Sequence, residues 1–493
     1  MSLSGIRASR AWTLCLIFLL AASQVLTAGA SASHPGESSD AAFAGQGTSG
    51  NAATSVVNRS TNASFGGLQA AIDAASPGDT IDVVADLIEG QISVNTNNLT
   101  LTTSNGSTIR MGVDTGAAGD NRAWFLVPAG TNLTVSNLTF DGNGFKVYQA
   151  FRHKGTGSFT DCTFVDIEYE LAGFDTVGSA IVSFNEGPNG GGVGVSVTGC
   201  EFTVIGLHGL FAFDSTCTVD NSTFVGVGAI GDRVTYAIEA GSGANVTASN
   251  SSFSACRGTV GGNDSAAILA TTFFGPGTAF TSTMNDIRDN SFGILTTPVD
   301  GSAINGSFNN FLGNSTGVSV DSGAGLENNW WGCNGGPGSA GCDAAVGGAD
   351  TSPWLVLTLD PPPTGTTPET CLVYGDSAIM TANLNVNSDG STVGGPANHV
   401  PDGGSVAWDG SGVGGFNPPL TTLVNGATSS VYSQLGFNGL YDFCASTDNA
   451  VVCQPIYIGV TKIPTLTEYG MIAFIALLAT AAVVMMRRQR AGA

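Results

Sequence analysis

The sequence predicts an all-β chain whose largest part is a solenoid of stacked coils, a parallel β-helix. Three observations carry this prediction. A unit of about 22 residues repeats between residues 132 and 331, short segments alternate apolar and polar residues, and 70 of the 493 residues are Gly while only 11% are charged. A unit of that length cannot bury its own apolar face, so consecutive units must stack on one another.

The repeat is marked by an aromatic residue three positions after an Asn, Asp or Gly. The copies are Asn137–Phe140, Asp161–Phe164, Gly199–Phe202, Asn221–Phe224, Asn250–Phe253, Asn305–Phe308 and Asn328–Trp331, with a weaker copy at Asn285–Ile287. The steps between these copies are 24, 38, 22, 29, 34, 21 and 23 residues, so the longer steps indicate the same unit carrying a loop. A leucine-rich repeat has a similar length, but its regular Leu lattice and Asn-rich helical half are absent.

Each repeat position predicts a place in the coil. Alternation directs Val195 and Val197 inward and Ser196 and Thr198 outward, and the recurring Phe predicts a stacked aromatic column in the interior. Asn at the turn tolerates a left-handed backbone and can bond its own main chain or the Asn of the next coil.

Three passages resemble a known family. They are the opening residues 65–84, the Asn-Leu-Thr phrases at Asn98 and Asn137, and the closing Asn329–Pro337 followed by Asp350–Trp354. Together they make residues 64–358 resemble the right-handed parallel β-helix family of pectin-lyase-like proteins. The resemblance implies an N-terminal cap, which we expect to be a helix beginning at Ser64 and ending at Pro77, with Leu68, Ala71, Ile72 and Ala75 on one face.

Other segments surround this solenoid. Arg7 and Arg10 precede an apolar run, Ala11–Ala22, which predicts a signal peptide over residues 1–32. A flexible linker is expected over 33–63, a β-helix over 64–358, a Pro-rich linker over 359–370, an Ig-like β-sandwich over 371–461, and a C-terminal signal over 462–493 with a transmembrane helix at 469–486.

The segment 371–461 alternates like a small sandwich. Strands are expected at Ile379–Val386, Val406–Trp408, Thr428–Leu435, Leu440–Ala445 and Pro455–Val460, with turns at Asn425-Gly426 and Ser388–Gly390. Their order resembles bacterial Ig-like domains of the invasin type, and the resemblance implies a spacer.

The C-terminal tail has three parts: a polar motif, an apolar run and basic residues. The motif residues are Ile463, Pro464, Thr465, Leu466, Glu468 and Gly470, and Arg487 and Arg488 follow the apolar run. A plain membrane anchor would share the last two parts. The complete pattern resembles the IPTL-CTERM sorting signal of Gram-negative bacteria, which implies transient residence in the inner membrane, cleavage by an exosortase-type protease and delivery to the cell surface.

Cysteine spacing predicts two disulfides in an oxidising compartment. Cys333 and Cys342 bracket a Gly-rich loop, and Cys444 and Cys453 bracket an expected hairpin. Cys162 and Cys200 hold the same repeat position, where stacked buried thiols and a bond are both open. No Cys/His cluster suggests zinc or redox chemistry.

The sequence presents no catalytic set, and no catalytic, cofactor-binding or metal residue is predicted. Asp286, Arg288 and Asp289 suggest a surface ion pair, His153 and His208 structural histidines, and Trp330-Trp331 a plug of the last coil. The family resemblance implies a calcium ion only if the chain is a polysaccharide lyase. Residues Ile167–Gly194, with Glu168, Glu170, Asp175 and Glu186, are expected to be an insertion, either a wall of a binding groove or a surface loop.

The formal net charge of −23 repels nucleic acid, and no basic stripe offsets it. We therefore expect an exported cell-surface protein whose repetitive Thr/Ser/Asn-rich flanks bind an extracellular polysaccharide or neighbouring cells. A polysaccharide lyase and a structural matrix component are the alternatives. The lyase alternative would be indicated by an acidic calcium-lined groove beside an Arg.

Overall fold

The computed structural model describes residues 54–491, apart from 172–173, 186–191, 228–234, 261–262, 273–274, 298–301, 322, 361–370, 374–376, 411–413, 435–438 and 460–465. The chain divides into two compact units, which are described separately: residues up to Val356 with Leu384–Asp402, and Leu357–Asn383 with Gly403 onward. The predicted signal peptide, linker residues 33–53, the Pro-rich segment 361–370 and the motif residues Ile463, Pro464 and Thr465 lie outside the described residues.

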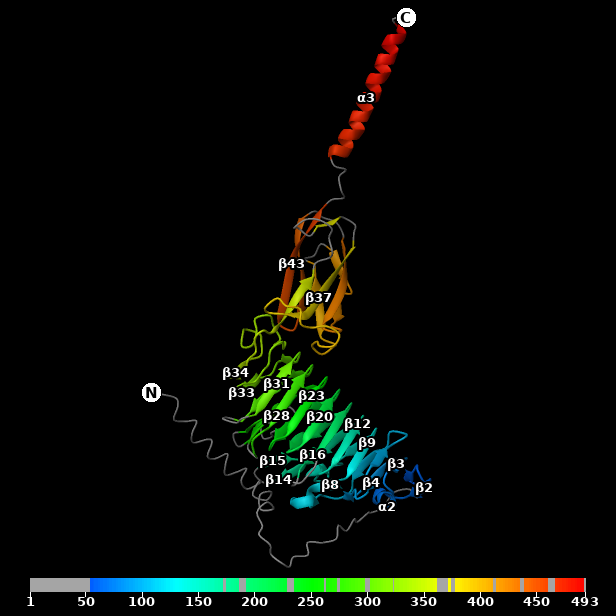
Figure 1. Ribbon diagram of the computed structural model, residues 1–493, viewed down its shortest axis with the longest axis vertical. Helices are drawn as coiled ribbons and strands as arrows, with labels where there is room; N and C mark the ends of the chain where they lie inside the picture. The colour runs from blue at the N-terminus through cyan, green and yellow to red at the C-terminus, as the bar shows by residue number, and fades with distance from the viewer. Residues whose placement is uncertain are drawn as a thin grey trace, which may run out of the picture. The chain divides into compact units, whose positions relative to one another are not determined.

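The first unit is a parallel β-helix, as predicted, and its strands form three sheets (Figure 1). Among the described residues, each full coil contributes one strand to each sheet. In spatial order, sheet A contains β2 (Ala63–Phe65), β1 (Val56–Asn58), β3 (Thr80–Val83), β6 (Leu99–Thr102), β9 (Asn132–Ser136), β12 (Thr156–Thr160), β17 (Gly194–Thr198), β20 (Thr216–Asp220), β23 (Asn245–Ser249), β28 (Ala279–Thr283) and β31 (Ala303–Ser307).

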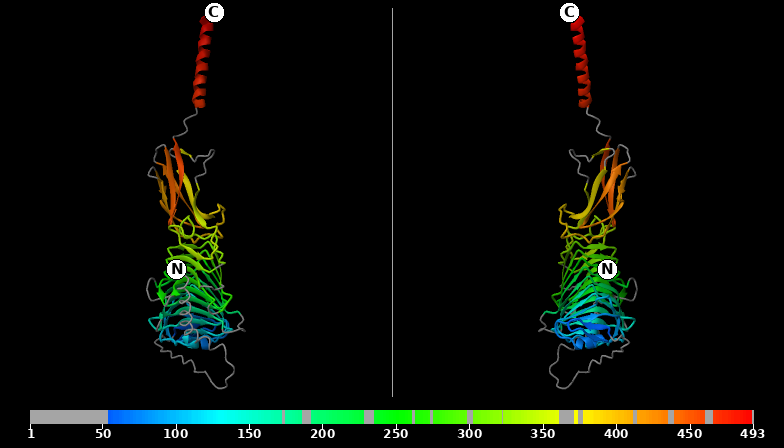
Figure 2. Two further views of the ribbon diagram at one scale, coloured as in Figure 1. Left: turned by 90° about the vertical axis from the view of Figure 1, so that its left-hand side faces the viewer. Right: turned by 90° about the vertical axis from the view of Figure 1, so that its right-hand side faces the viewer.

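Sheets B and C complete each coil, and Figure 2 shows the coils as successive layers. Sheet B contains β4 (Leu87–Glu89), β7 (Thr108–Met111), β10 (Thr139–Asp141), β13 (Thr163–Ile167), β18 (Glu201–Ile205), β21 (Thr223–Val225), β24 (Ser252–Ser254), β29 (Asp286–Arg288) and β32 (Asn310–Leu312). Sheet C contains β5 (Ile92–Ser93), β8 (Ala123–Val127), β11 (Gln149–His153), β16 (Ser179–Phe184), β19 (His208–Phe213), β22 (Tyr236–Gly241), β27 (Ala266–Ala270), β30 (Phe292–Thr296), β33 (Thr316–Val320) and β34 (Ala345–Gly347).

The predicted aromatic column runs through the core along sheet B. The rings of Phe164 and Phe202 stack 5.0 Å apart at an interplanar angle of 6°, and those of Phe202 and Phe224 stack 4.2 Å apart at 3°. The copy predicted at Asn305–Phe308 is wrong in register, because Phe311 pairs with Ile287 of the preceding coil. Phe308 instead occupies the turn, with φ of 60°.

Two-residue turns join every strand of sheet A to the following strand of sheet B from β9 to β32. The first turn residue has positive φ, as at Asn137 (60°), Asp161 (52°) and Asn221 (47°), a conformation that Asn and Asp tolerate. The second turn residue builds an internal ladder. Its backbone N–H donates to the side chain of the equivalent residue one coil further on, through Cys162, Cys200, Ser222, Ser251, Asn285, Asn309 and Asn329.

The N-terminal end is closed by the short helix α2 (Leu68–Asp73) and by β1 and β2. Leu68, Ala71 and Ile72 are buried, as predicted, whereas Ala75 lies beyond the helix, which ends at Asp73 rather than at Pro77. The helix begins at Leu68 rather than Ser64, because Ala63–Phe65 pairs with β1, which in turn pairs antiparallel with β3. Residues 56–58 are therefore a strand of sheet A, which corrects the prediction of a flexible linker up to residue 63. The buried Glu89 carboxylate accepts the backbone N–H of Leu68 (2.8 Å).

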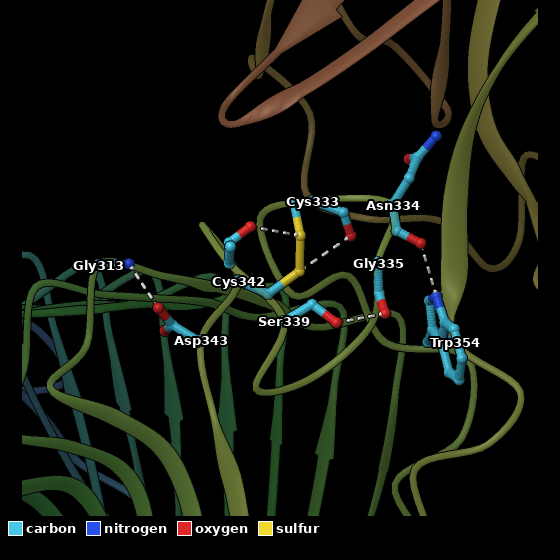
Figure 3. Close-up of a disulfide and its surroundings, with 9 residues drawn as sticks. Gly313, Cys333, Asn334, Gly335, Ser339, Cys342, Asp343 and Trp354 are labelled. Atoms are coloured by element: carbon cyan, nitrogen blue, oxygen red, sulfur yellow. Dashed lines mark hydrogen bonds between the residues drawn. A yellow bond between two sulfur atoms is a disulfide. The ribbon is translucent and has the colours of Figure 1, made fainter.

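The C-terminal end of the β-helix is closed by the predicted disulfide Cys333–Cys342 and the loop that it holds (Figure 3). The indole N–H of Trp354 donates to the carbonyl of Asn334 (3.1 Å). The carboxylate of Asp343 accepts the backbone N–H of Gly313 (3.0 Å) and the side-chain amide of Asn314 (2.7 Å). Trp330 and Trp331 are buried, and Trp331 stacks on Phe311 at 4.7 Å, which confirms the predicted plug.

Two small sheets pack face to face after the β-helix and include the described residues of each of the five strands predicted there; Leu435 and Val460 lie outside the described residues. One contains β35 (Leu355–Asp360), β37 (Ser377–Asn387), β41 (Ala427–Gln434) and β39 (Gly414–Asn417); the other contains β36 (Cys371–Val373), β43 (Ala450–Gly459), β42 (Gly439–Thr447), β38 (Ser405–Asp409) and β40 (Leu420–Thr422). Tyr432 and Phe443 meet edge to face between them (4.4 Å), and Trp408 lies 5.2 Å from Phe416. The predicted disulfide Cys444–Cys453 is present.

The last element is α3 (Leu466–Ala491). Its residues Gly470–Arg488 form a 19-residue stretch that is long and apolar enough to cross a membrane. Leu466, Glu468 and Gly470 of the predicted sorting motif lie in its first turns, and Arg487 and Arg488 close the apolar stretch.

Candidate functional site

The three sheets differ in what connects them, and this difference locates the candidate site. The turns from sheet A to sheet B have two residues from β9 onward and at most five before it, whereas the longest connections enter or leave sheet C. Examples are the hairpin β14 (Tyr169–Leu171) and β15 (Phe174–Val177), the hairpin β25 (Thr259–Val260) and β26 (Asn263–Asp264), and the interval from Val225 to Tyr236. Because insertions tend to carry binding residues on a rigid scaffold, the outer face of sheet C is the candidate site.

The expected insertion at Ile167–Gly194 is in fact two connections around a regular strand. Its middle, Ser179–Phe184, is β16, which pairs in parallel with β11 and β19. The strand was missed because residues Ala180 and Ile181 both face the core, which breaks the alternation that identifies a strand. The same pair of inward positions recurs in β19, where Gly209 lies against the ring of Phe224 and Leu210 is in the core.

Two columns of side chains project from the outer face of sheet C. In the first column, register places Gln149, Ser179, His208, Tyr236, Ala266 and Phe292 opposite one another on successive strands. In the second, it places Arg152, Val182, Phe211, Glu239, Leu269 and Leu295 opposite one another. Tyr236, Ala266 and Leu269 form a small apolar cluster with Leu207, Phe292 and Leu295, separate from the interior core.

An aromatic platform lies on this face. The rings of Phe184 and Phe213 are 4.9 Å apart, and Phe211 meets Phe213 edge to face at 6.1 Å. The guanidinium of Arg152 lies 4.6 Å from the centre of the Phe184 ring. We call Phe184, Phe211, Phe213 and Arg152 the aromatic platform. All three rings are partly exposed, so the platform offers flat apolar surface beside a cation.

Arg152 of the platform and the neighbouring Lys154 are buried cations that share one carboxylate. Lys154 Nζ and Arg152 Nε lie 2.6 and 3.0 Å from Oδ1 of Asp120, which is carried by η2 (Gly119–Arg122). Burial alone would raise the pKa of Asp120, but the hydrogen bonds and positive charges of Lys154 and Arg152 lower it below its ordinary value. The carboxylate therefore stays ionised across the physiological pH range.

A polar chain crosses the same face. The Ser179 hydroxyl lies 2.9 Å from Nδ1 of His208, and Nε2 of His208 lies 2.6 Å from Oε2 of Glu239. Ser179, His208 and Glu239 are 4%, 8% and 6% exposed. The imidazole stacks on the ring of Phe211 (5.0 Å between ring centres) and on the ring of Tyr236 (6.0 Å). Burial, reinforced by the negative charge of Glu239, raises the pKa of Tyr236, so its hydroxyl stays protonated.

The residues singled out in the sequence are scattered by the structure. Arg288 pairs with Asp286 (2.6 Å) on sheet B, and Asp289 pairs with Arg257 (3.3 Å), so the expected surface ion pair is present and lies away from sheet C. His153 is wholly buried, whereas His208 belongs to the polar chain on the outer face. Cys162 and Cys200 are free buried thiols, with the Cys162 N–H 3.4 Å from Cys200 Sγ.

Ser179, Glu239 and Gln149 were not identified from the sequence. No motif spacing links them, since they come from three separate coils. The segments 149–153, 179–184, 208–213 and 236–241 are equivalent strands. An alignment of these four segments would have placed Gln149, Ser179 and Glu239 in adjacent columns. Among the described residues, no group of three or more His, Cys, Asp or Glu side chains is arranged to hold a metal ion.

No protein-family model, curated protein or solved structure matches this chain. The class of protein is therefore defined by the fold itself: a β-helix with a small β-sandwich and an apolar C-terminal helix. The two disulfides suggest an extracytoplasmic location, and the apolar helix α3 is a possible anchor.

Proposed function

We propose that this is an exported cell-surface protein whose β-helix binds an extracellular polysaccharide along the outer face of sheet C. The observation that supports the proposal is the aromatic platform beside Asp120 and Lys154, on the sheet at which the long connections converge. A pyranose ring has an apolar face that packs on Phe, while its hydroxyls exchange hydrogen bonds with charged groups fixed in place. The polymer belongs to the extracellular matrix or to the coat of a neighbouring cell.

The route to the surface is proposed on the C-terminal tail. Its resemblance to an IPTL-CTERM signal supports transient anchoring by α3 in the inner membrane, followed by removal of the tail by an exosortase-type protease. The resemblance to pectin-lyase-like β-helices supports carbohydrate as the ligand, and the Ig-like resemblance supports a spacer role for the sandwich. The mass of the C-terminus of the secreted protein tests the tail: an intact Ala493 would contradict cleavage.

The binding proposal is tested by replacing the platform. Phe213→Ala removes a ring that contacts both Phe184 and Phe211. Aromatic contacts of this kind contribute about 1 kcal/mol beyond their buried area, so we expect affinity for the bound polysaccharide to fall about fivefold. Affinity electrophoresis of the full chain in gels containing neutral or acidic polysaccharides measures the change.

The matched control is Tyr457→Ala, which removes a half-exposed aromatic ring from β43 of the sandwich. It should leave the migration in every gel unchanged. Equal retardation of the wild-type chain and Phe213→Ala by the same polysaccharide would contradict the proposal, as would the absence of retardation by any polymer tested.

A further inference from the structure

Four polar residues from four successive strands lie next to one another on the outer face of sheet C. Gln149, Ser179 and His208 are directly opposite one another on the successive strands β11, β16 and β19. Glu239 projects from the next strand, β22, in the neighbouring column, and reaches back to His208. Further along the first column the equivalent positions hold Ala266 and Phe292, so the β-helix does not require polar residues here.

The two partners of His208 give this chain a direction of proton transfer when Glu239 is the acceptor. An ionised Glu239 accepts the proton on Nε2 of His208, which leaves Nδ1 as the acceptor for the Ser179 hydroxyl. A hydroxyl bonded to an imidazole that is itself oriented by a carboxylate is the arrangement that activates serine as a nucleophile. The interaction is held in a site whose three members are less than 10% exposed, where electrostatic interactions are stronger than in water.

A fourth group is available to stabilise negative charge. The Oε1 atom of the buried Gln149 accepts a hydrogen bond from Nη1 of Arg152 (3.3 Å), so its amide N–H₂ is the end that remains a donor. Because Gln149 is opposite Ser179 in the sheet, this amide belongs to the strand that adjoins the nucleophile. Side-chain amides serve as donors to the oxyanion that forms when serine attacks a carbonyl.

We propose that the outer face of sheet C is an esterase site that removes short acyl groups, such as acetyl, from the hydroxyls of a polysaccharide. Ser179 is the nucleophile, His208 the general base, Glu239 the residue that orients His208, and Gln149 the oxyanion donor. The small exposure of Ser179, together with the neighbouring Phe211 and Tyr236 rings at His208, favours a small apolar acyl group over a bulky one.

The proposed reaction has two balanced steps. Ser179 Oγ forms a bond to the ester carbonyl carbon while its proton passes to Nδ1 of His208. The bond between the carbonyl carbon and the sugar oxygen then breaks, and His208 gives the proton to that oxygen, which leaves as a hydroxyl. Water next attacks the acyl-serine, giving one proton to His208, and Ser179 Oγ leaves and regains that proton. The net reaction consumes one ester and one water and yields an alcohol and a carboxylic acid.

This inference rests on the proposed function for its polymeric substrate, but the chemistry is tested without a polysaccharide. The full chain is incubated with p-nitrophenyl acetate, and nitrophenolate release is followed. We expect turnover by the wild type, at least a 100-fold lower rate for Ser179→Ala and for His208→Gln, and a lower rate for Glu239→Gln. Ser254→Ala, on β24 of sheet B, should retain the wild-type rate.

A second measurement does not depend on whether the variants fold. The wild-type chain is treated with a fluorophosphonate, and the modified residue is located by peptide mass spectrometry. Labelling at Ser179 is expected; labelling elsewhere only, or no turnover of p-nitrophenyl acetate above free imidazole, would overturn the esterase proposal. Turnover without retention by any polysaccharide would instead overturn the binding proposal and leave the esterase site standing.

Discussion

The outer faces of sheets A and C arise from the same coils and yet have opposite character. From β6 to β31, one outward column of sheet A contains Thr100, Thr134, Ser158, Ser196, Thr218, Thr247, Thr281 and Asn305, and its neighbour contains Thr102, Ser136, Thr160, Thr198, Asp220, Ser249, Thr283 and Ser307. We call these two columns the hydroxyl ladder; Asp220 is their only charged member. Sheet C instead presents aromatic rings, cations and a buried His–Glu pair.

This difference indicates which face of a solenoid can carry a specific binding or catalytic site. From β9 to β31 every strand of sheet A is followed by a turn of the same two-residue length, so each coil repeats one arrangement. On sheet C the connections vary in length, so each strand can carry a different outward residue beside a different neighbour. Burying the charged groups of Arg152, Lys154 and Glu239 removes them from water, a cost that a solvated face does not incur. Because sheet C buries charged groups at this cost, its outer face is a better candidate for a catalytic site than the outer face of sheet A.

The largest expected effect tests whether sheet A is stabilised from within rather than by its hydroxyl ladder. The buried amide of Asn309 accepts the N–H of Asn285 (3.1 Å), and it donates to the carbonyl of Ser282 (2.8 Å) and to Oδ1 of Asn329 (2.9 Å). Asn309→Ala removes these hydrogen bonds and leaves their buried donors and acceptors unsatisfied. The free energy of unfolding should therefore fall by about 4 kcal/mol. Denaturation with urea measures the loss.

Asn310→Ala is the matched control for that experiment, because Asn310 is the next residue but is only partly buried and bonds Asp286 on sheet B. A similar loss of unfolding free energy in both variants would show that the internal ladder stabilises the β-helix no more than a surface hydrogen bond does.

A second prediction concerns His153, the histidine of sheet C that faces the core. His153 is wholly buried in β11, and a Cβ atom on Gly157 would lie 2.7 Å from its Nε2, so Gly157 leaves the ring its space. Burial lowers the pKa of His153 from 6.5 to about 4. As the pH falls from 6.5 toward 4, the unfolded chain gains a proton that the folded chain excludes, and stability falls by up to about 3 kcal/mol.

Urea denaturation as a function of pH measures this slope. His153→Leu removes the titrating group, so the variant should lose less stability than the wild type between pH 6.5 and 4. An unchanged slope would mean that other groups, rather than this buried imidazole, set the acid sensitivity of the β-helix.

The sequence predicted the fold more fully than the site, for a physical reason. Residues such as Phe164 and Phe202 recur because the coils stack in register, and a recurring residue is visible in one sequence. Ser179, His208 and Glu239 do not recur, and their strands contain two adjacent inward residues that hide the alternation. The error at Asn305–Phe308 has the related cause that the turn position there holds Phe308, which mimics the core aromatic three residues before the true one, Phe311.

The smallest expected effect concerns the hydroxyl ladder, the polar flank at which the sequence alone would place polymer binding. Thr218 is exposed, and its hydroxyl bonds Ser196 at 3.0 Å, a contact that water replaces with little loss. Thr218→Ala should therefore change the free energy of unfolding by no more than about 0.5 kcal/mol, since exposed substitutions away from caps and networks rarely do more. Because the proposal assigns binding to sheet C, the variant should also keep wild-type retardation in polysaccharide gels.

If Thr218→Ala weakened retardation while Phe213→Ala did not, the assignment of the two faces would be reversed. The outer face of sheet A would then bind the polymer by many equal weak contacts, and sheet C would retain the proposed ester chemistry alone.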